Sequence, residues 1–189
     1  WAESTRAYLE QRRIPGKYFP RFPMIGFYPS IETIEQYLLS EGFSTEIIQE
    51  SNVLQKCFRN CCLIFTYRDE IGNTLGFKGR KPSIKLKEIK YQKGFKSEIK
   101  DRAIMGLECC NLALKDGERV VCLEGEFDWL TAQVASLKQH DKTGEFICFG
   151  GSDVKPAKLE TLKRAGARVL YLSFDPDQAG KKATKEAIK

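Results

Sequence analysis

The sequence predicts an α/β protein, in which an α+β N-terminal part is followed by a parallel sheet. After residue 118, apolar runs of strand length alternate with helical patterns, which is typical of βαβ units with right-handed crossovers. Before that point, helical patterns give way to alternating, strand-like segments separated by turns. We therefore expect two domains, at residues 1–115 and 116–189.

Helical patterns open the chain. Apolar residues at helical spacing predict a helix within residues 1–13, and an aromatic, proline-rich loop follows at 17–30. Two short helices come next, since Ser30 and Ser44 stand at N-cap positions and Gly42 separates the two patterns.

The period of the apolar residues then changes from helix to strand. Residues 61–80 predict two strands around a Gly72-Asn73 turn, with Arg and Lys at the polar positions. Residues 81–96 continue as a basic, alternating strand pattern, and residues 100–117 are expected to form a helix.

The last third of the chain has a regular strand–helix alternation. We expect strands at 119–125, 145–151 and 168–177, and helices at 127–140, 155–166 and 179–189. The segment Arg-Val-Leu-Tyr-Leu-Ser-Phe at 168–174 is almost fully apolar, which predicts a strand buried on both faces of the sheet.

The composition is that of a globular protein, with 42% hydrophobic and 30% charged residues. No apolar stretch is long enough to span a membrane. The seven cysteines lack the spacing of a zinc site, so we expect them to act as small hydrophobic residues in a reducing compartment.

The formal net charge of +6 is concentrated in one segment. Residues 68–100 hold ten basic and four acidic residues, whereas the rest of the chain is balanced. A local excess of Lys and Arg is typical of a surface that neutralises phosphates. A solvated charged face is the alternative interpretation.

Acidic residues follow two of the predicted strands. Asp175 and Asp177 come directly after the apolar run at 168–174, and Glu124 and Asp128 lie at and just after the end of the strand at 119–125. Neighbouring parallel strands would bring these carboxylates to one edge of the sheet, where a divalent cation would offset their repulsion. Oxygen ligands favour Mg²⁺ or Mn²⁺. The alternative is that Asp175 or Asp177 only caps the following helix.

The ordered pair "EGEFD" and, about fifty residues later, "DPDQAG" resembles the Toprim domain of bacterial DnaG-type primases, topoisomerases and some nucleases. The resemblance implies a Rossmann-like parallel sheet. It also implies that Glu124, Asp175 and Asp177 bind the metal ion and that Asp128 supports this catalytic site.

The upstream region is similar to the polymerase core of DnaG-type primases, in "CFRN", "GFKGR", "IKYQKGFK" and "AIMGLECC". The likeness covers nearly the whole chain. Cys61 departs from it, because the family usually has an Arg there, and "EGEFD" is closer to primase-helicases of phages and plasmids. The residues implied to lie near the template or the nucleotide phosphates are Arg59, Asn60, Lys78, Arg80 and Lys90.

The resemblance implies a DNA primase core, which makes short RNA primers on a single-stranded DNA template from NTPs by metal-dependent nucleotidyl transfer. The implied partners are the template, NTPs and a replicative helicase, in the cytoplasm at the nucleoid and without a membrane. A truncated Toprim sheet is expected, because the chain stops within a predicted helix. Two alternatives remain: a metal-dependent nuclease, and a degenerate primase that binds single-stranded DNA and recruits a helicase.

Overall fold

The computed structural model divides into two compact units. One comprises Trp1–Thr66 and Gly76–Phe95, and the other comprises Tyr67–Leu75 and Lys96–Lys189. The boundary at 115/116 stays a prediction. The structure describes residues 3–51, 53, 54, 58, 61, 63–81, 91–95, 99, 101–110 and 119–188.

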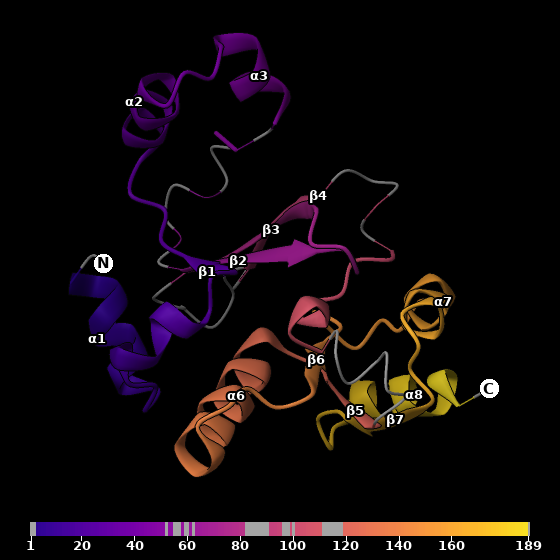
Figure 1. Ribbon diagram of the computed structural model, residues 1–189. Helices are drawn as coiled ribbons and strands as arrows, with labels where there is room; N and C mark the ends of the chain where they lie inside the picture. The colour runs from indigo at the N-terminus through magenta and orange to yellow at the C-terminus, as the bar shows by residue number, and fades with distance from the viewer. Residues whose placement is uncertain are drawn as a thin grey trace. The chain divides into compact units, whose positions relative to one another are not determined.

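The N-terminal helices have the caps that the sequence predicts. The Ser30 hydroxyl accepts a hydrogen bond from the Thr33 amide at 3.1 Å, and the Ser44 hydroxyl accepts one from the Ile47 amide at 3.4 Å. The elements (Figure 1) are α1 (Glu3–Gln11), the 3-10 helix η1 (Gly16–Arg21), α2 (Ile31–Ser40) and α3 (Thr45–Glu50).

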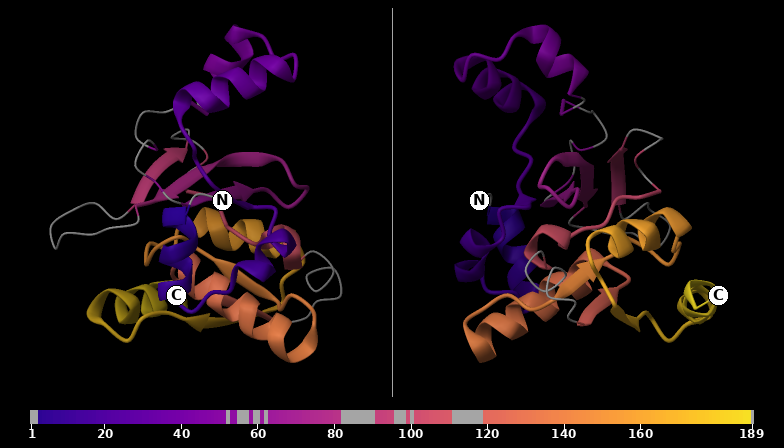
Figure 2. Two further views of the ribbon diagram at one scale, coloured as in Figure 1. Left: turned by 90° about the vertical axis from the view of Figure 1, so that its left-hand side faces the viewer. Right: turned by 45° about the vertical axis from the view of Figure 1, so that its right-hand side comes forward.

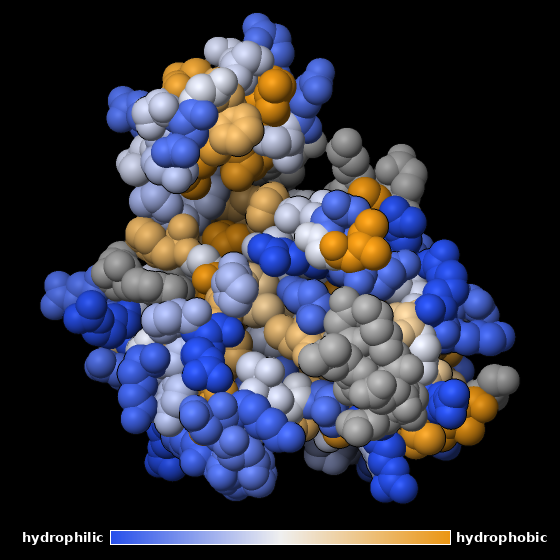
Figure 3. All heavy atoms as spheres, in the orientation of Figure 1, coloured by the Kyte–Doolittle hydropathy of each residue, from blue (hydrophilic) through white to orange (hydrophobic). Residues whose placement is uncertain are grey.

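Helices α2 and α3 and the turn between them expose several large side chains, and Figure 3 shows hydrophobic residues in orange over this part of the chain. These side chains are Tyr37, Leu39, Phe43 and Ile47. None of the residues of α2 is buried.

A four-stranded sheet follows in the order β1-β2-β3-β4. Its strands are β1 (Ile25–Gly26), β2 (Leu63–Arg68), β3 (Thr74–Arg80) and β4 (Tyr91–Phe95). The β2–β3 hairpin is as predicted: the Asp69 carboxylate accepts hydrogen bonds from the Ile71 and Asn73 amides, and Gly72 has a φ of 92°. The loop predicted at 17–30 is only partly correct, because it contains η1 and β1. Strand β1 forms because its backbone pairs with β2.

The C-terminal sheet is parallel, with the order β6-β5-β7 (Figure 2), which confirms the predicted fold class. Its strands are β5 (Arg119–Leu123), β6 (Phe146–Cys148) and β7 (Val169–Ser173). The strands alternate with α6 (Glu126–His140), α7 (Pro156–Arg164) and α8 (Gln178–Ala187).

The helix expected at 100–117 is wrong for the described residues 101–110. Ile104 forms a β-bridge with Arg68, Met105 forms one with Cys148, and only a 3-10 turn, η3 (Leu107–Cys110), follows. The physical reason is the pairing of these residues with distant strands, and Gly106, with a φ of 83°, permits the turn that ends the extended segment.

The prediction that the last strand is buried on both faces is also wrong. Val169 and Tyr171 of β7 are 44% and 45% exposed, and their partners on the same face of β5, Arg119 and Val121, are exposed and partly exposed. The other face is better covered: Val120 and Cys122 are fully buried, and their partners Leu170 and Leu172 are partly buried. The apolar segment therefore has one face toward the core and one face that is largely exposed.

The described cysteines serve as core residues. Cys61, Cys109, Cys110, Cys122 and Cys148 are free, and all except the partly exposed Cys109 are buried. Burial raises the pKa of Cys122 to about 12, so this thiol is uncharged near neutral pH. These cysteines therefore act as the small hydrophobic residues that the sequence predicts.

Within the described part of the chain, no helix has the length and apolar character needed to cross a lipid bilayer.

Candidate active site

Strands β5 and β7 bring two carboxylates to one edge of the sheet. They are parallel neighbours, with Leu123 in register with Ser173, so the residues after each strand emerge side by side. The Glu124 carboxylate accepts a hydrogen bond from the Asp175 amide at 3.3 Å. The structure therefore brings Glu124 to the start of the Asp-Pro-Asp turn.

Asp177 is the N-cap of α8. Its Oδ1 accepts a hydrogen bond from the Gly180 amide at 2.8 Å, so the capping interpretation holds for this aspartate. Capping uses one carboxylate oxygen, and the side chain remains exposed. A capping role and a ligand role are therefore compatible in Asp177.

Asp128 has a related position at the start of α6. Its Oδ2 accepts a hydrogen bond from the Gly125 amide at 3.2 Å. A Cβ at position 125 would lie 2.7 Å from this oxygen, so a larger residue there would require the Asp128 side chain to move. Asp128 therefore stabilises the turn that leaves the strand.

The four carboxylates form one electrostatic group. Partial burial raises the pKa of Glu124, and the negative charges of Asp175, Asp177 and Asp128 raise it further, whereas the hydrogen bond from the Asp175 amide lowers it. Among the residues that the structure describes, no three Asp, Glu, His or Cys side chains gather closely enough to hold a metal ion. The donor set is nevertheless all carboxylate oxygen, which suits Mg²⁺ or Mn²⁺.

Replacing Glu124 by Gln is expected to stabilise the fold by about 0.5 kcal/mol at neutral pH in the presence of EDTA, because it removes repulsion from a partly solvated, screened position. The raised pKa means that the folded chain keeps this proton to higher pH than the unfolded chain. The destabilisation of the unsubstituted protein by the Glu124 charge is therefore absent below about pH 4.5, and it grows as the pH rises through the pKa of Glu124 in the folded chain.

Thermal unfolding of both proteins at pH 4 and pH 7 measures this effect. An equal or lower melting temperature of Glu124→Gln at pH 7 would show that the carboxylates do not repel one another.

A glycine-containing loop after β6 lies beside Glu124. The Gly151 amide donates to the Glu124 carbonyl at 2.8 Å, and the Cys148 thiol donates to the same carbonyl at 3.4 Å. Gly150 and Gly151 have φ values of 73° and 143°, which other residues rarely adopt. This loop was not predicted as part of the site, although Gly-Gly after a strand was a usable signal.

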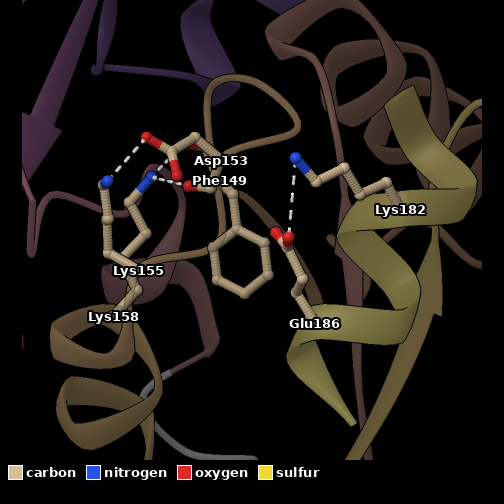
Figure 4. A network of polar contacts seen from close by, with 6 residues as sticks. All are labelled: Phe149, Asp153, Lys155, Lys158, Lys182 and Glu186. Carbon is tan, nitrogen blue, oxygen red and sulfur yellow. Dashed lines mark hydrogen bonds and ion pairs between the residues drawn. The ribbon is translucent and has the colours of Figure 1, made fainter. Parts of the chain in front are cut away.

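Lys158 of α7 binds two backbone carbonyl groups of this loop. Its ammonium donates to the Phe149 carbonyl at 2.6 Å and to the Asp153 carbonyl at 3.5 Å, and the lysine is 6% exposed. Figure 4 shows these contacts beside the ion pair of Lys155 with Asp153, whose N–O distance is 3.2 Å. The buried lysine thus fixes the course of the loop rather than facing solvent.

The two glutamates of "EGEFD" have different environments. Glu124 lies at the carboxylate edge, whereas Glu126 is 1% exposed and accepts a hydrogen bond from the Tyr67 hydroxyl. A Cβ at Gly150 would collide with that hydroxyl. Glu126 is therefore a buried structural residue, which the sequence motif alone does not reveal.

The predicted nucleic-acid residues are only partly described. Lys78 and Arg80 are buried, at 5% and 3% exposure, and the Arg80 Nε donates to the Tyr8 hydroxyl at 2.8 Å. The same hydroxyl accepts from the Arg12 Nε at 2.9 Å, a role of Tyr8 that sequence reasoning missed. Arg59, Asn60 and Lys90 lie outside the described residues. Direct contacts to nucleic acid stay a prediction.

Comparison with known proteins supports the likeness to Toprim domains and to DnaG-type primases. Residues 121–189 match the Toprim-like family. A DNA primase of Deinococcus radiodurans is 33% identical over 155 residues, which cover 79% of this chain and 25% of that protein. The chain thus spans about a quarter of the length of this relative.

Solved structures show the same fold. The zinc-binding and RNA polymerase domains of Aquifex aeolicus primase match with a TM-score of 0.80 and 22% identity, over 99% of this chain and 46% of that one. The DnaG primase catalytic domain bound to single-stranded DNA matches with a TM-score of 0.70 and 23% identity, over 98% of this chain and 60% of that one. Taken with the sequence matches, this fold supports a divergent DnaG-type primase core, with a Toprim-like domain in the C-terminal part of the chain.

Proposed function

We propose that this chain is the catalytic core of a DNA primase, which synthesises short RNA primers on single-stranded DNA by nucleotidyl transfer. The observation that carries the proposal is the carboxylate edge, where Glu124 meets Asp175 and is electrostatically coupled to Asp177. The likeness to DNA primases over most of the chain supports it.

Glu124, Asp175 and Asp177 would hold Mg²⁺ or Mn²⁺, which would supply charge stabilisation for the nucleotide phosphates. In the reaction, the 3′-hydroxyl oxygen of the growing primer forms a bond to the α-phosphorus of an NTP. The bond from that phosphorus to the bridging oxygen breaks, and pyrophosphate leaves.

Glu124 has two roles open to it in this step. It is either a ligand or the general base that receives the hydroxyl proton, and a raised pKa suits a proton acceptor. Asp128 and the loop at 149–153 would hold Glu124 in place through the backbone contacts on either side of it.

The proposed template is single-stranded DNA. A related DnaG catalytic domain is known bound to single-stranded DNA, and residues 68–100 carry the excess of positive charge. In this proposal the undescribed Arg59, Asn60 and Lys90 contribute to the basic surface, and the buried Lys78 and Arg80 support it from inside the N-terminal unit. A replicative helicase is the proposed partner protein.

The direct test is to incubate the chain with single-stranded DNA, labelled NTPs and Mg²⁺ or Mn²⁺, and to separate the products by size. Short RNA products that require all four components are expected. Cleavage of the DNA without NTPs would instead indicate a nuclease, because the same carboxylates can activate water. DNA binding without any product would indicate a binding module.

A further inference from the structure

A small cavity in the C-terminal unit gathers three arginines away from the carboxylate edge. It has a volume of about 90 Å³, and its lining includes Arg68, Arg102, Arg164 and Thr161 together with the acidic Asp69 and Glu70. The cavity plays no part in the proposed primase reaction. We propose that it is a binding site for one phosphate group, either free phosphate or the terminal phosphate of a nucleotide.

The arginines come from three separate segments. Arg68 is the last residue of β2, Arg102 precedes the bridged segment at 104–105, and Arg164 is the last residue of α7. The backbone bridge between Arg68 and Ile104 holds the first two segments together. Arg102 and Arg164 are exposed, so water screens their charges, and the partly buried Arg68 is the arginine whose charge most needs a partner.

The acidic residues of the lining offset this charge only in part. The carboxylate of Asp69 is engaged by the hairpin turn, through the Ile71 amide at 3.1 Å and the Asn73 amide at 2.7 Å. Three guanidinium groups therefore face two carboxylates, one of which already has backbone partners. The lining residues carry a formal charge of about +1, and the buried Glu108 carboxylate, which is not part of the lining, interacts electrostatically with Arg68.

The Arg68 side chain has unused hydrogen-bonding capacity. Its Nε is buried and has no hydrogen-bond partner among the described residues. Arg164 donates to the Thr161 hydroxyl at 3.4 Å, and that hydroxyl donates to the Ala157 carbonyl at 2.9 Å. Buried polar atoms are nearly always satisfied in native proteins, so the unsatisfied Nε indicates an absent partner.

The ligand is identified by its charge, shape and size. Guanidinium groups match the oxygens of phosphate in pairs, which makes arginine the preferred residue for this anion. A water molecule occupies about 30 Å³ in the liquid. The cavity is therefore large enough to admit a tetrahedral oxyanion.

The site is distinct from the carboxylate edge by topology. Glu124 and Asp175 follow the carboxyl ends of parallel strands, whereas Arg164 ends the helix that leads back to the start of β7. None of the four carboxylates of that edge lines the cavity. The proposal does not depend on primase activity.

Isothermal titration of the whole chain with sodium phosphate, in a chloride buffer of matched ionic strength, tests this site. We expect saturable 1:1 binding, and we expect Arg102→Gln to raise the Kd about tenfold, equivalent to about 1.4 kcal/mol. Arg168→Gln is the matched control, because it removes an exposed arginine outside the lining and should leave the Kd unchanged.

NMR of the arginine side chains gives a second measurement on the unmodified protein: phosphate should shift the Nε–Hε resonance of Arg68. If ATP competes with phosphate for the site, the ligand is the terminal phosphate of a nucleotide. If ATP does not compete, the ligand is free phosphate.

No saturable binding to the unmodified chain, or equal Kd values for Arg102→Gln and Arg168→Gln, would overturn the proposal. In that case the charge of Arg68 only compensates the charge of Glu108, whose buried carboxylate oxygens also lack hydrogen-bond partners among the described residues.

Discussion

Replacing Asp175 and Asp177 together by asparagine should lower primer synthesis at least about a hundredfold, a loss typical of removing charged groups that stabilise a transition state. The change keeps the shape of both side chains but removes the two negative charges expected to bind the metal ion. The rate of RNA product formation on single-stranded DNA at saturating Mg²⁺ measures the effect.

Asparagine is the informative replacement because Asp177 also caps α8 through the Gly180 amide. Asparagine is as good an N-cap as aspartate, so the melting temperature should change little. Asp177→Ala is the comparison, and it should cost about 1 kcal/mol of stability from the lost cap. If the asparagine variant retains full activity while it folds normally, the carboxylates are not the catalytic site.

Replacing Gly180 by alanine should destabilise the protein by about 1–3 kcal/mol, as an overpacked buried position does. In a helix this substitution usually stabilises by about 0.5–1 kcal/mol. The sign is expected to reverse because a Cβ at Gly180 would collide with the backbone carbonyl of Asp175. The clash would also displace Asp175, so primer synthesis should fall with stability.

Urea unfolding measures the change in stability. Ala179→Gly, at the exposed neighbouring position of the same helix, measures the ordinary propensity cost of about 1 kcal/mol without a clash. A stabilised Gly180→Ala protein would mean that α8 does not approach the Asp-Pro-Asp turn as the structure shows.

Local sequence signals predicted much of the fold. Ser30 and Ser44 marked the helix starts because a hydroxyl cap satisfies amides that the helix itself leaves unpaired. Strand–helix alternation after residue 118 predicted the parallel sheet, since parallel strands need a crossover. The sheet then placed Glu124 beside Asp175, as expected for residues that follow neighbouring strands.

Long-range pairing decided what these local patterns left open. The segment at 101–110 lost its expected helix because Met105 pairs with Cys148, a residue far along the chain. The apolar strand β7 exposes Val169 and Tyr171 because they lie on the same face of the sheet as the exposed Arg119 of β5. Periodicity reports the tendency of a segment, whereas its neighbours determine which faces are covered.

The same distinction applies to the site. The sequence by itself determined which carboxylates follow which strands, because chain order and strand length place them at a sheet edge. Only the tertiary structure separated Glu124 from Glu126, buried Lys78 and Arg80, and brought the 149–153 loop to Glu124. Burial and hydrogen-bond partners come from distant residues such as Tyr67 and Tyr8, and no short motif encodes them.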